Sequence, residues 1–416
     1  MRQLWYAPVL ALATALMMLR LFALARLLDI PNFAQLSAAL LVSTTFTMLG
    51  CLGLQSLLQR DMPIMFVRGR ERAARVLLGQ SVIVAYASAV VAMLAALVVP
   101  FNFGSPANLV ALGIVHGLSQ QLFVVASVES RSRGEPLRFA VQSLVRSLVI
   151  VAAGLATARL IRSAPAVVVA EALVSLAIAH GLLWETMGRA MSGVAATIRI
   201  AFDRMRRIDW RAAWVLLLVS LLAFALTYAD RWGAASVLGS HDFANYSFAG
   251  TILAIGLSAQ SLVNASVYPM LARLYAREGR RACFSLCSKL SLIALVGGLV
   301  LALPAYFVLE FAMQRWYPAY DIALSLVAPF LVVAALRVSD FWSSYMMITG
   351  LQDRLLKTNM LAGGAAALLW IAIAQPWNAA GRTPARFALL AVLLAVIGYA
   401  AVVLASWRSS REEAAP

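Results

Sequence analysis

The sequence has few of the residues on which soluble enzymes depend. Of its 416 residues only 12% are charged, three are histidine and three are cysteine, whereas 62% are hydrophobic. A soluble protein of this length could not hide so much apolar surface. Together with a mean hydropathy of +0.85, this composition predicts an all-α polytopic membrane protein.

Catalytic and metal-binding motifs are missing as well. The sequence contains no Walker A motif, glycine-rich nucleotide loop or HExxH motif, and His116, His180 and His241 are scattered. The cysteines lie in or beside apolar stretches, so no disulfide framework is expected. Cys283 and Cys287 are spaced i,i+4, but no histidine is near, and we interpret them as packing residues. We therefore expect neither an enzyme nor a cofactor or metal site.

Twelve stretches are long and apolar enough to cross a membrane, which requires roughly 20 residues each. Each is bounded by charge, proline or glycine. The predicted spans are 4–28, 34–58, 74–99, 106–128, 137–158, 164–186, 212–230, 243–268, 285–309, 319–346, 358–376 and 386–407.

The charge that is present has mostly one sign. Lysine and arginine total 34 against 18 aspartate and glutamate, which gives a net charge of +16. Most of these cations lie at the two termini and in alternate loops between spans, namely 59–75, 129–138, 187–211, 273–289 and 353–357. The positive-inside rule places these loops and both termini in the cytoplasm. This distribution favours contact with anionic membrane lipid and not with nucleic acid.

A stretch near the N-terminus occurs twice. ARLLDIPNFAQLS (25–37) and ASVLGSHDFANYS (235–247) share five of thirteen residues at an offset of 210. Both precede an even-numbered predicted span, which favours a parallel duplication of six spans. We predict two pseudo-symmetric six-helix bundles facing each other across a central cavity. The predicted domains are an N-terminal bundle (1–187), a basic amphipathic linker (188–211), a C-terminal bundle (212–407) and a cytoplasmic polar tail (408–416).

Three arginines within or at the outer ends of predicted spans are candidates for binding an anion. An arginine at mid-span costs about 2.5–3.5 kcal/mol on insertion scales, so it usually faces a cavity or a partner. Arg20 has no acidic residue at helical spacing; it either lines a cavity and binds an anion, or snorkels to the outer surface. Arg26 is nearer the outer end and fits an interfacial anchor equally well. Arg146 is the third candidate.

Carboxylates and further arginines lie in other spans. Arg337 and Asp340 are spaced i,i+3, and we predict that they pair. Glu171 and the neighbours Asp230 and Arg231 lie nearer span ends. The same offset of 210 aligns Arg20 with Asp230, so the two halves are hypothesised to contribute opposite charges at related positions. These five residues are candidates for charge pairing or ion coupling.

Longer patterns resemble a known family. ARLLDIPNFAQLSAALLVSTTFTMLGCLGLQSLLQRDMP (25–63) is similar to the N-terminal signature of Wzx-type polysaccharide flippases, in the multidrug/oligosaccharidyl-lipid/polysaccharide exporter superfamily. Asn32-Phe33-Ala34 stands where the family has an acidic residue, Phe and Gly. In the second half, TYADRWGAASVLGSHDFANYSFA (227–249) and SVYPMLARLYAREGRR (266–281) resemble later family patterns. All of these patterns are degenerate, and none includes a catalytic motif.

The resemblance implies a V-shaped pair of bundles in the bacterial inner membrane. Such a flippase would move a polyprenyl-diphosphate-linked oligosaccharide, a polysaccharide or O-antigen repeat unit, from the inner to the outer leaflet by alternating access. A diphosphate-sugar head cannot cross hydrocarbon unaided, so a cationic cavity is expected to hold it. Arg20 is the first candidate for the diphosphate, followed by Arg146 and Arg26.

Several features of this function stay open. No cofactor is expected, but coupling to an H⁺ or Na⁺ gradient would use Asp230, Asp340 or Glu171 as carrier. Other glycan-assembly proteins are further expected partners. A multidrug cation antiporter of the same superfamily is the second hypothesis. It ranks below the flippase because cationic drugs favour acidic cavities, whereas the deepest charges here are arginines. A membrane glycan polymerase or glycosyltransferase ranks third, because the large outer loop that it needs is missing.

Overall fold

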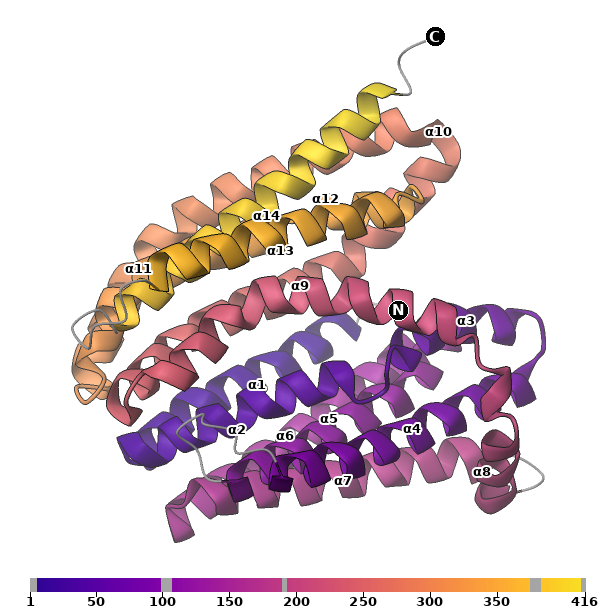
Figure 1. Cartoon of the computed structure of the whole chain (residues 1–416), viewed down its shortest axis with the longest axis horizontal. Helices are drawn as coiled ribbons and strands as arrows, with labels where there is room; N and C mark the ends of the chain where they lie inside the picture. The colour runs from indigo at the N-terminus through magenta and orange to yellow at the C-terminus, as the bar shows by residue number, and fades with distance from the viewer. Residues whose placement is uncertain (1–5, 99–106, 189–192, 375–382, 413–416) are drawn as a thin grey trace. The chain divides into compact units, whose positions relative to one another are not determined.

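The protein is built of long helices joined by short connections (Figure 1). The computed structural model describes residues 6–98, 107–188, 193–374 and 383–412. The first helices are α1 (Tyr6–Leu27), α2 (Ile30–Leu49), α3 (Leu54–Val67), α4 (Glu71–Val98), α5 (Ala107–Ser132), α6 (Pro136–Ile161), α7 (Ala164–Gly188) and α8 (Gly193–Asp203). After the 3-10 turn η2 (Met205–Arg207) come α9 (Trp210–Val237), α10 (Ser240–Trp316), α11 (Asp321–Val338), α12 (Trp342–Ile348), α13 (Gln352–Ala374) and α14 (Pro384–Glu412).

Ten helical segments of the described chain are long and apolar enough to cross a membrane. The remaining two predicted spans, 243–268 and 358–376, fall on α10 and α13. These helices confirm the predicted class of all-helical polytopic membrane protein. Two further details differ from the prediction. α10 joins two predicted spans through a single non-helical residue, Gly279, and the predicted span 34–58 is divided into α2 and α3.

The break between α2 and α3 depends on Gly53. Leu52 and Gly53 both have positive φ, 48° and 84°, a backbone conformation that glycine adopts without steric cost. A Cβ atom at Gly53 would overlap the carbonyl oxygen of Ala213 at the start of α9. The chain therefore turns here and brings α3 against α9, where a continuous helix would carry it past.

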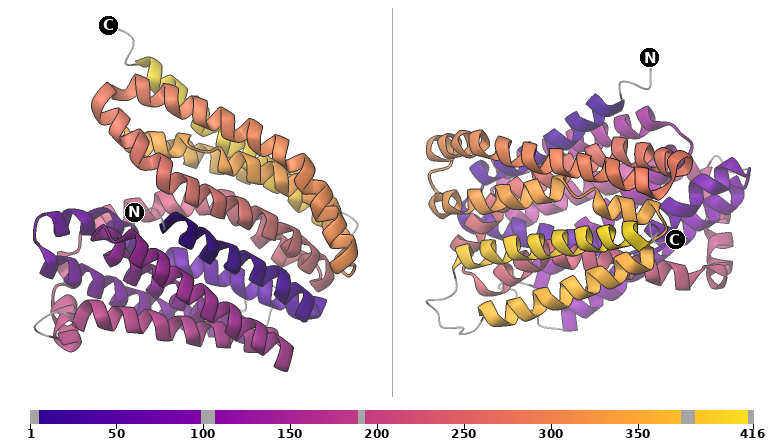
Figure 2. Two further views of the ribbon diagram at one scale, coloured as in Figure 1. Left: turned by 180° about the vertical axis from the view of Figure 1, so that it is seen from behind. Right: turned by 90° about the horizontal axis from the view of Figure 1, so that it is seen from above.

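The chain divides into two compact units, Met1–Leu221 and Leu222–Pro416, with the boundary inside α9. Within each unit the long helices run roughly along a common direction (Figure 1, Figure 2). Of the predicted linker and tail, residues 189–192 and 413–416 lie outside the described residues. The predicted domain limits at 187, 211 and 407 remain predictions.

The duplicated stretch forms the same turn in both units. α1 ends at Leu27 and α2 begins at Ile30, whereas α9 ends at Val237 and α10 begins at Ser240, each 210 positions later. The phenylalanine that the two stretches share makes the same hydrogen bond in both turns. The backbone N–H of Phe33 donates to the carbonyl oxygen of Asp29, and that of Phe243 donates to the carbonyl oxygen of Gly239, both at 2.9 Å. Both phenylalanine side chains are buried. The agreement of helix ends and hydrogen bonds supports the interpretation of a structural repeat.

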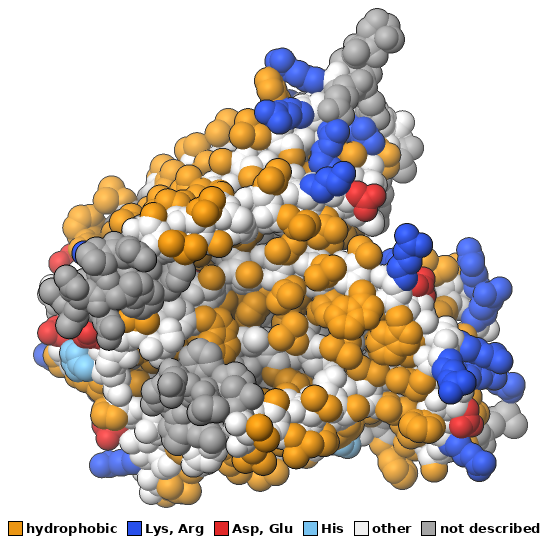
Figure 3. All heavy atoms as spheres, viewed as in Figure 1, with side chains coloured by type: hydrophobic (Ala, Val, Ile, Leu, Met, Phe, Trp, Pro, Cys, Tyr) orange, Lys and Arg blue, Asp and Glu red, His pale blue; other side chains and the backbone are white. Residues whose placement is uncertain are grey.

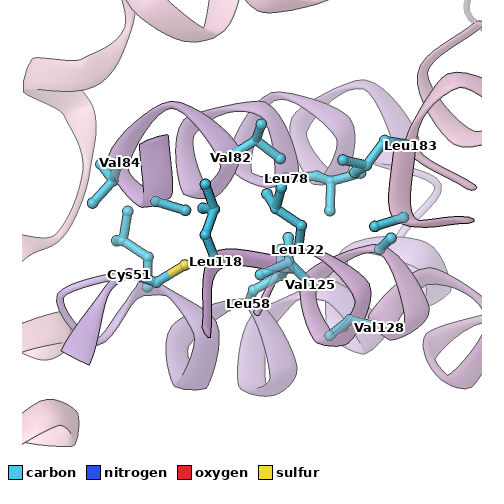
Figure 4. Close-up of a cluster of buried hydrophobic side chains, with 14 of the residues drawn as sticks. Cys51, Leu58, Leu78, Val82, Val84, Leu118, Leu122, Val125, Val128 and Leu183 are labelled. Atoms are coloured by element: carbon cyan, nitrogen blue, oxygen red, sulfur yellow. The ribbon is translucent and has the colours of Figure 1, made fainter. Parts of the chain in front are cut away.

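The apolar core of the first unit lies between α3, α4, α5 and α7 (Figure 4). Leu58, Leu78, Leu122 and Val125 from three of these helices are fully buried and point toward one another. In a membrane, such close packing replaces the hydrophobic effect as the force that holds helices together. This core fixes α5 and α7, which carry most of the buried polar groups described below.

The predicted cytoplasmic end of this unit is held by an ionic cluster. Glu129 of α5 is buried and accepts from Arg133 Nε at 2.6 Å, while Arg133 Nη2 lies 3.2 Å from Glu71 of α4. Arg138 of α6 contacts Glu129 at 3.8 Å and Glu185 of α7 at 3.0 Å. Partial burial lowers the pKa of Arg133, but its bonds to the two carboxylates outweigh burial and raise that pKa. The cluster thus connects the ends of four helices.

Glu129→Gln is expected to destabilise the protein by about 2 kcal/mol, because hydrogen bonds to charged groups contribute about 1.5–3 kcal/mol. Glu135→Gln is the matched control, since Glu135 also bonds Arg138 but is 44% exposed; its effect should stay within about 0.5 kcal/mol. Thermal unfolding of the purified proteins in detergent measures both. Equal melting temperatures for the two variants would show that burial of Glu129 contributes nothing.

Candidate functional site

Arg20 and Glu171 form a buried ion pair between α1 and α7. Arg20 Nη1 lies 2.6 Å from Glu171 Oε2, and the two side chains are 5% and 0% exposed. No acidic residue lies at helical spacing from Arg20 in the sequence. Its partner Glu171 is 151 positions away. With this partner, Arg20 does not snorkel to the surface. The pair offsets much of the cost of placing an arginine within a span.

His116 of α5 extends the pair toward α2. Its Nε2 lies 3.5 Å from Glu171 Oε2, and its Nδ1 lies 2.8 Å from the Ser43 hydroxyl. The direction of the hydrogen bond between Nδ1 and the Ser43 hydroxyl depends on which ring nitrogen carries the proton. A Cβ atom at Gly117 would lie 2.6 Å from the carbonyl oxygen of Ser43, so glycine permits this close approach of α5 to α2. His116, one of the three histidines that are scattered in the sequence, is therefore part of the site.

Arg146 of α6 belongs to the same network. Its Nη2 donates to Gln120 Oε1, and its Nε donates to the Ser175 hydroxyl at 3.1 Å. The guanidinium carbon lies 4.3 Å from the centre of the Phe123 ring, a cation–π distance. Gln120 Nε2 in turn lies 3.4 Å from His116 Nε2. Two of the three arginines predicted from sequence are thus connected through Glu171, His116 and Gln120.

The network keeps unused hydrogen-bonding capacity. Arg20 Nε and Glu171 Oε1 are buried and have no hydrogen-bond partner among the described residues. Buried polar atoms without partners are rare, because each costs roughly 1–3 kcal/mol. They mark a place where a polar ligand or water would be favourable. Arg26, by contrast, is exposed near the end of α1 and takes no part in the network.

Gly154 of α6 makes room for Glu171, because a Cβ atom there would overlap Glu171 Oε1. Gly154→Ala is expected to push the carboxylate off Arg20 and destabilise the protein by about 1–3 kcal/mol. Gly181→Ala is the matched control, since nothing lies within 4 Å of a Cβ atom there; it should be neutral or stabilising by up to about 1 kcal/mol. The melting temperature should fall for Gly154→Ala and should not fall for Gly181→Ala. A stabilised Gly154→Ala protein would contradict this expectation.

In the second unit, Asp230 and Arg231 tie α9 to α10. The Tyr246 hydroxyl donates to Asp230 Oδ2, and Arg231 Nη2 donates to the carbonyl oxygen of Gly250 at 2.8 Å. Asp230 is 1% exposed. Arg20 and Asp230, which occupy equivalent repeat positions, thus each have a polar partner within their own unit.

Arg337 and Asp340, which are predicted to pair, each have hydrogen-bond partners of their own. Arg337 Nη2 donates to the carbonyl oxygen of Leu226 at 3.1 Å, and Asp340 accepts from the backbone N–H and hydroxyl of Ser343 at 3.2 and 2.9 Å. α11 ends at Val338, so Asp340 lies just beyond the helix that carries Arg337. Both residues line a cavity of about 60 Å³ with Ser343, Asn359 and Tyr399.

Solved structures with a similar fold are transporters and flippases. An inward-facing multidrug resistance MATE family transporter of the MOP superfamily matches 98% of this chain and 94% of its own, with TM-score 0.62 and 12% identity. The lipid II flippase MurJ, in an inward closed conformation, matches 96% of this chain and 87% of its own, with TM-score 0.64 and 8% identity. The chain has the fold that these MATE and MurJ structures share. The Vibrio cholerae MATE transporter VcmN agrees, with TM-score 0.59 and 16% identity over 99% of this chain and 98% of its own.

These likenesses concern the fold alone, because every identity is low. No protein-family model matches the chain, and no curated protein matches it in sequence. Both MATE transporters and MurJ share the fold, so the fold by itself does not distinguish a drug antiporter from a lipid flippase. The distinction has to come from the buried charges.

Proposed function

We propose that the protein is a flippase for a polyprenyl-diphosphate-linked oligosaccharide in the bacterial inner membrane. The observation that carries this proposal is the connection of two intramembrane arginines, Arg20 and Arg146, in one buried polar network. The shared fold with MurJ, a lipid II flippase, supports a lipid-linked substrate. The repeat unit of a surface polysaccharide or lipopolysaccharide is the substrate class that the sequence resemblance implies.

Guanidinium groups suit a diphosphate. An arginine presents several N–H donors in a plane that matches two phosphate oxygens at once, and its charge is permanent. In the proposed cycle the diphosphate takes the place of Glu171 on Arg20, whose Nε is already without a partner. Arg146 provides a second cationic group deeper in the first unit, while the polyprenyl tail stays in lipid. Rocking of the two bundles would expose the head to one leaflet and then to the other.

Release of Arg20 would leave Glu171 as an uncompensated buried carboxylate. Such a charge is stabilised by taking up H⁺ or Na⁺, and His116 is the nearest ionisable neighbour at 3.5 Å. Glu171 is therefore the preferred coupling residue of the proposal, ahead of Asp230 and Asp340. Coupling would make the return of Arg20 to Glu171 the step that expels the substrate.

The test is complementation of a deletion strain, with surface glycan and the leaflet position of the lipid-linked oligosaccharide as readouts. Arg20→Ala should lower surface glycan at least tenfold and cause the lipid-linked precursor to accumulate facing the cytoplasm. Arg26→Ala is the matched control on the same helix and should restore surface glycan. Full restoration by Arg20→Ala, at equal protein level, would remove the diphosphate role of that arginine.

A multidrug cation antiporter is the second candidate, because MATE transporters share the fold and Glu171 and Asp230 are buried carboxylates. It predicts Glu171-dependent efflux of cationic dyes from cells and no effect of deletion on surface glycan. The flippase proposal predicts no Glu171-dependent dye efflux and a loss of surface glycan on deletion. A polymerase or glycosyltransferase ranks below both.

A further inference from the structure

The connection between the two halves contains an amphipathic helix that is fixed to the first unit. Thr197 and Ala201 form the buried face of α8, and a Cβ atom at Gly79 of α4 would lie 2.9 Å from the Cβ atom of Ala201. Just after the helix, Gln80 Nε2 donates to the carbonyl oxygen of Arg204 at 2.8 Å. α8 thus packs against α4.

The exposed side of α8 and the turn after it combine cations with apolar side chains. Arg199 is exposed, Ile200 is 37% exposed and Phe202 is 66% exposed. We call the exposed residues Arg199, Ile200, Phe202, Arg204, Arg206 and Arg207 the α8 surface. The exposed acids beside it are Asp203 and Asp209, so cations outnumber acids. Figure 3 shows blue side chains gathered at the end of the first unit where α3 and α8 lie.

The position of α8 along α4 matches the membrane interface. Gly79 follows Glu71, the first residue of α4, by eight positions, or about 12 Å of helix rise. This is where the charged first turns of α4 give way to its apolar run. On α9, the 48% exposed Trp214 lies one turn after Trp210, and aromatic side chains are enriched at this level of a membrane.

We propose that the α8 surface binds the headgroups of anionic phospholipids in the cytoplasmic leaflet. The arginines donate to the phosphate oxygens, which guanidinium groups favour, while Phe202 and Ile200 enter the apolar edge of the same leaflet. A soluble acidic partner would use the arginines but has no need for a 66% exposed phenylalanine at membrane depth. The inference does not depend on which substrate the protein transports.

Lipid retention tests the proposal directly. The purified full-length protein is reconstituted in nanodiscs with equal phosphatidylglycerol and phosphatidylcholine, and the lipids that stay bound are counted by native mass spectrometry. Wild type should retain phosphatidylglycerol preferentially. The triple variant Arg199→Gln, Arg206→Gln, Arg207→Gln should lower this preference about tenfold, since every basic residue near the surface contributes to the attraction. Addition of soluble glycerol phosphate should leave retention unchanged, because it lacks the apolar part of the interaction.

Two exposed arginines at the other end of the first unit provide the control. Arg159→Gln with Arg162→Gln removes charge near the end of α6 and should keep the lipid preference of wild type. Equal retention of the two lipids by wild type, or an unchanged preference in the triple variant, would overturn the proposal.

A depth measurement covers the case in which the triple variant folds poorly. Cys51, Cys283 and Cys287 are all buried, so a spin label can be directed to Phe202→Cys alone. In phosphatidylglycerol bilayers the label should be relaxed more by membrane-dissolved oxygen than by an aqueous nickel chelate. Stronger relaxation by the nickel chelate would place position 202 in the cytoplasm, overturn the lipid proposal and favour a soluble partner.

Discussion

Glu171→Ala is expected to destabilise the protein by about 3–5 kcal/mol. Arg20 is 5% exposed on its side chain and Glu171 is fully buried, so removal of the carboxylate leaves a buried guanidinium without its counter-ion. Loss of one partner of a buried ion pair typically costs this amount. His116 would lose its contact with the carboxylate as well. The measurement is thermal unfolding of purified protein in detergent, together with the protein level in membranes.

Two further variants separate the ion pair from its function. Replacement of both partners, Arg20→Met with Glu171→Leu, should recover most of the lost stability, because a buried pair exchanged for apolar groups of similar size is often neutral or stabilising. This double variant should still fail to export glycan, since no cation is left for the diphosphate. Glu135→Ala is the exposed control and should cost less than about 1 kcal/mol. A double variant that exports normally would leave the ion pair with a purely structural role.

The all-helical membrane class and the repeated turn followed from the sequence because both rest on local signals. Apolar length and composition predict spans, and the offset of 210 between the two related stretches predicted turns that end and begin at equivalent residues. The partner of Arg20 could not be predicted in this way, because 151 residues separate it from Glu171. Only the packing of α1 and α7 on α6 within the first unit decides which acid Arg20 meets.

His116 was missed for a related reason. A single histidine in an apolar helix usually packs without a specific role, and nothing in one helix reveals Ser43 or Glu171 as its neighbours. The available signal was Gly113-x-x-His116-Gly117, in which small residues on both sides let the backbone of α2 approach the histidine. Glycines that flank a polar residue in a span therefore indicate a close helix contact at that residue better than the polar residue does alone.

The hydrogen-bond partners of Arg337 and Asp340 could not be predicted for a different reason. The break between α11 and α12 falls on Ser339, Asp340 and Phe341, where neither proline nor glycine interrupts the sequence. Pro329, the residue that would ordinarily suggest an interruption, lies inside α11. Asp340 bonds the backbone N–H of Ser343 instead, which provides an alternative to the helical hydrogen bond that a span would otherwise need. Such competition is hard to detect in an apolar stretch.

At Gly53, both the local backbone conformation and a tertiary contact require glycine. Gly53→Ala is expected to destabilise the protein by more than about 3 kcal/mol. A φ of 84° is unfavourable for alanine by about 1–2 kcal/mol, and the added methyl group would overlap the carbonyl oxygen of Ala213. Because backbone atoms cannot move aside as a flexible side chain can, α3 and α9 would have to separate.

Gly69→Ala isolates the backbone part of this effect. Gly69 also has a positive φ, 67°, but nothing lies within 4 Å of a Cβ atom there. It should cost only about 1–2 kcal/mol, the penalty of the left-handed conformation. The difference between the two variants in thermal unfolding therefore reports the contact of Gly53 with Ala213 alone. If both glycines cost the same, the turn at 50–53 is needed only for its backbone conformation, and the close approach of α3 to α9 contributes nothing to stability.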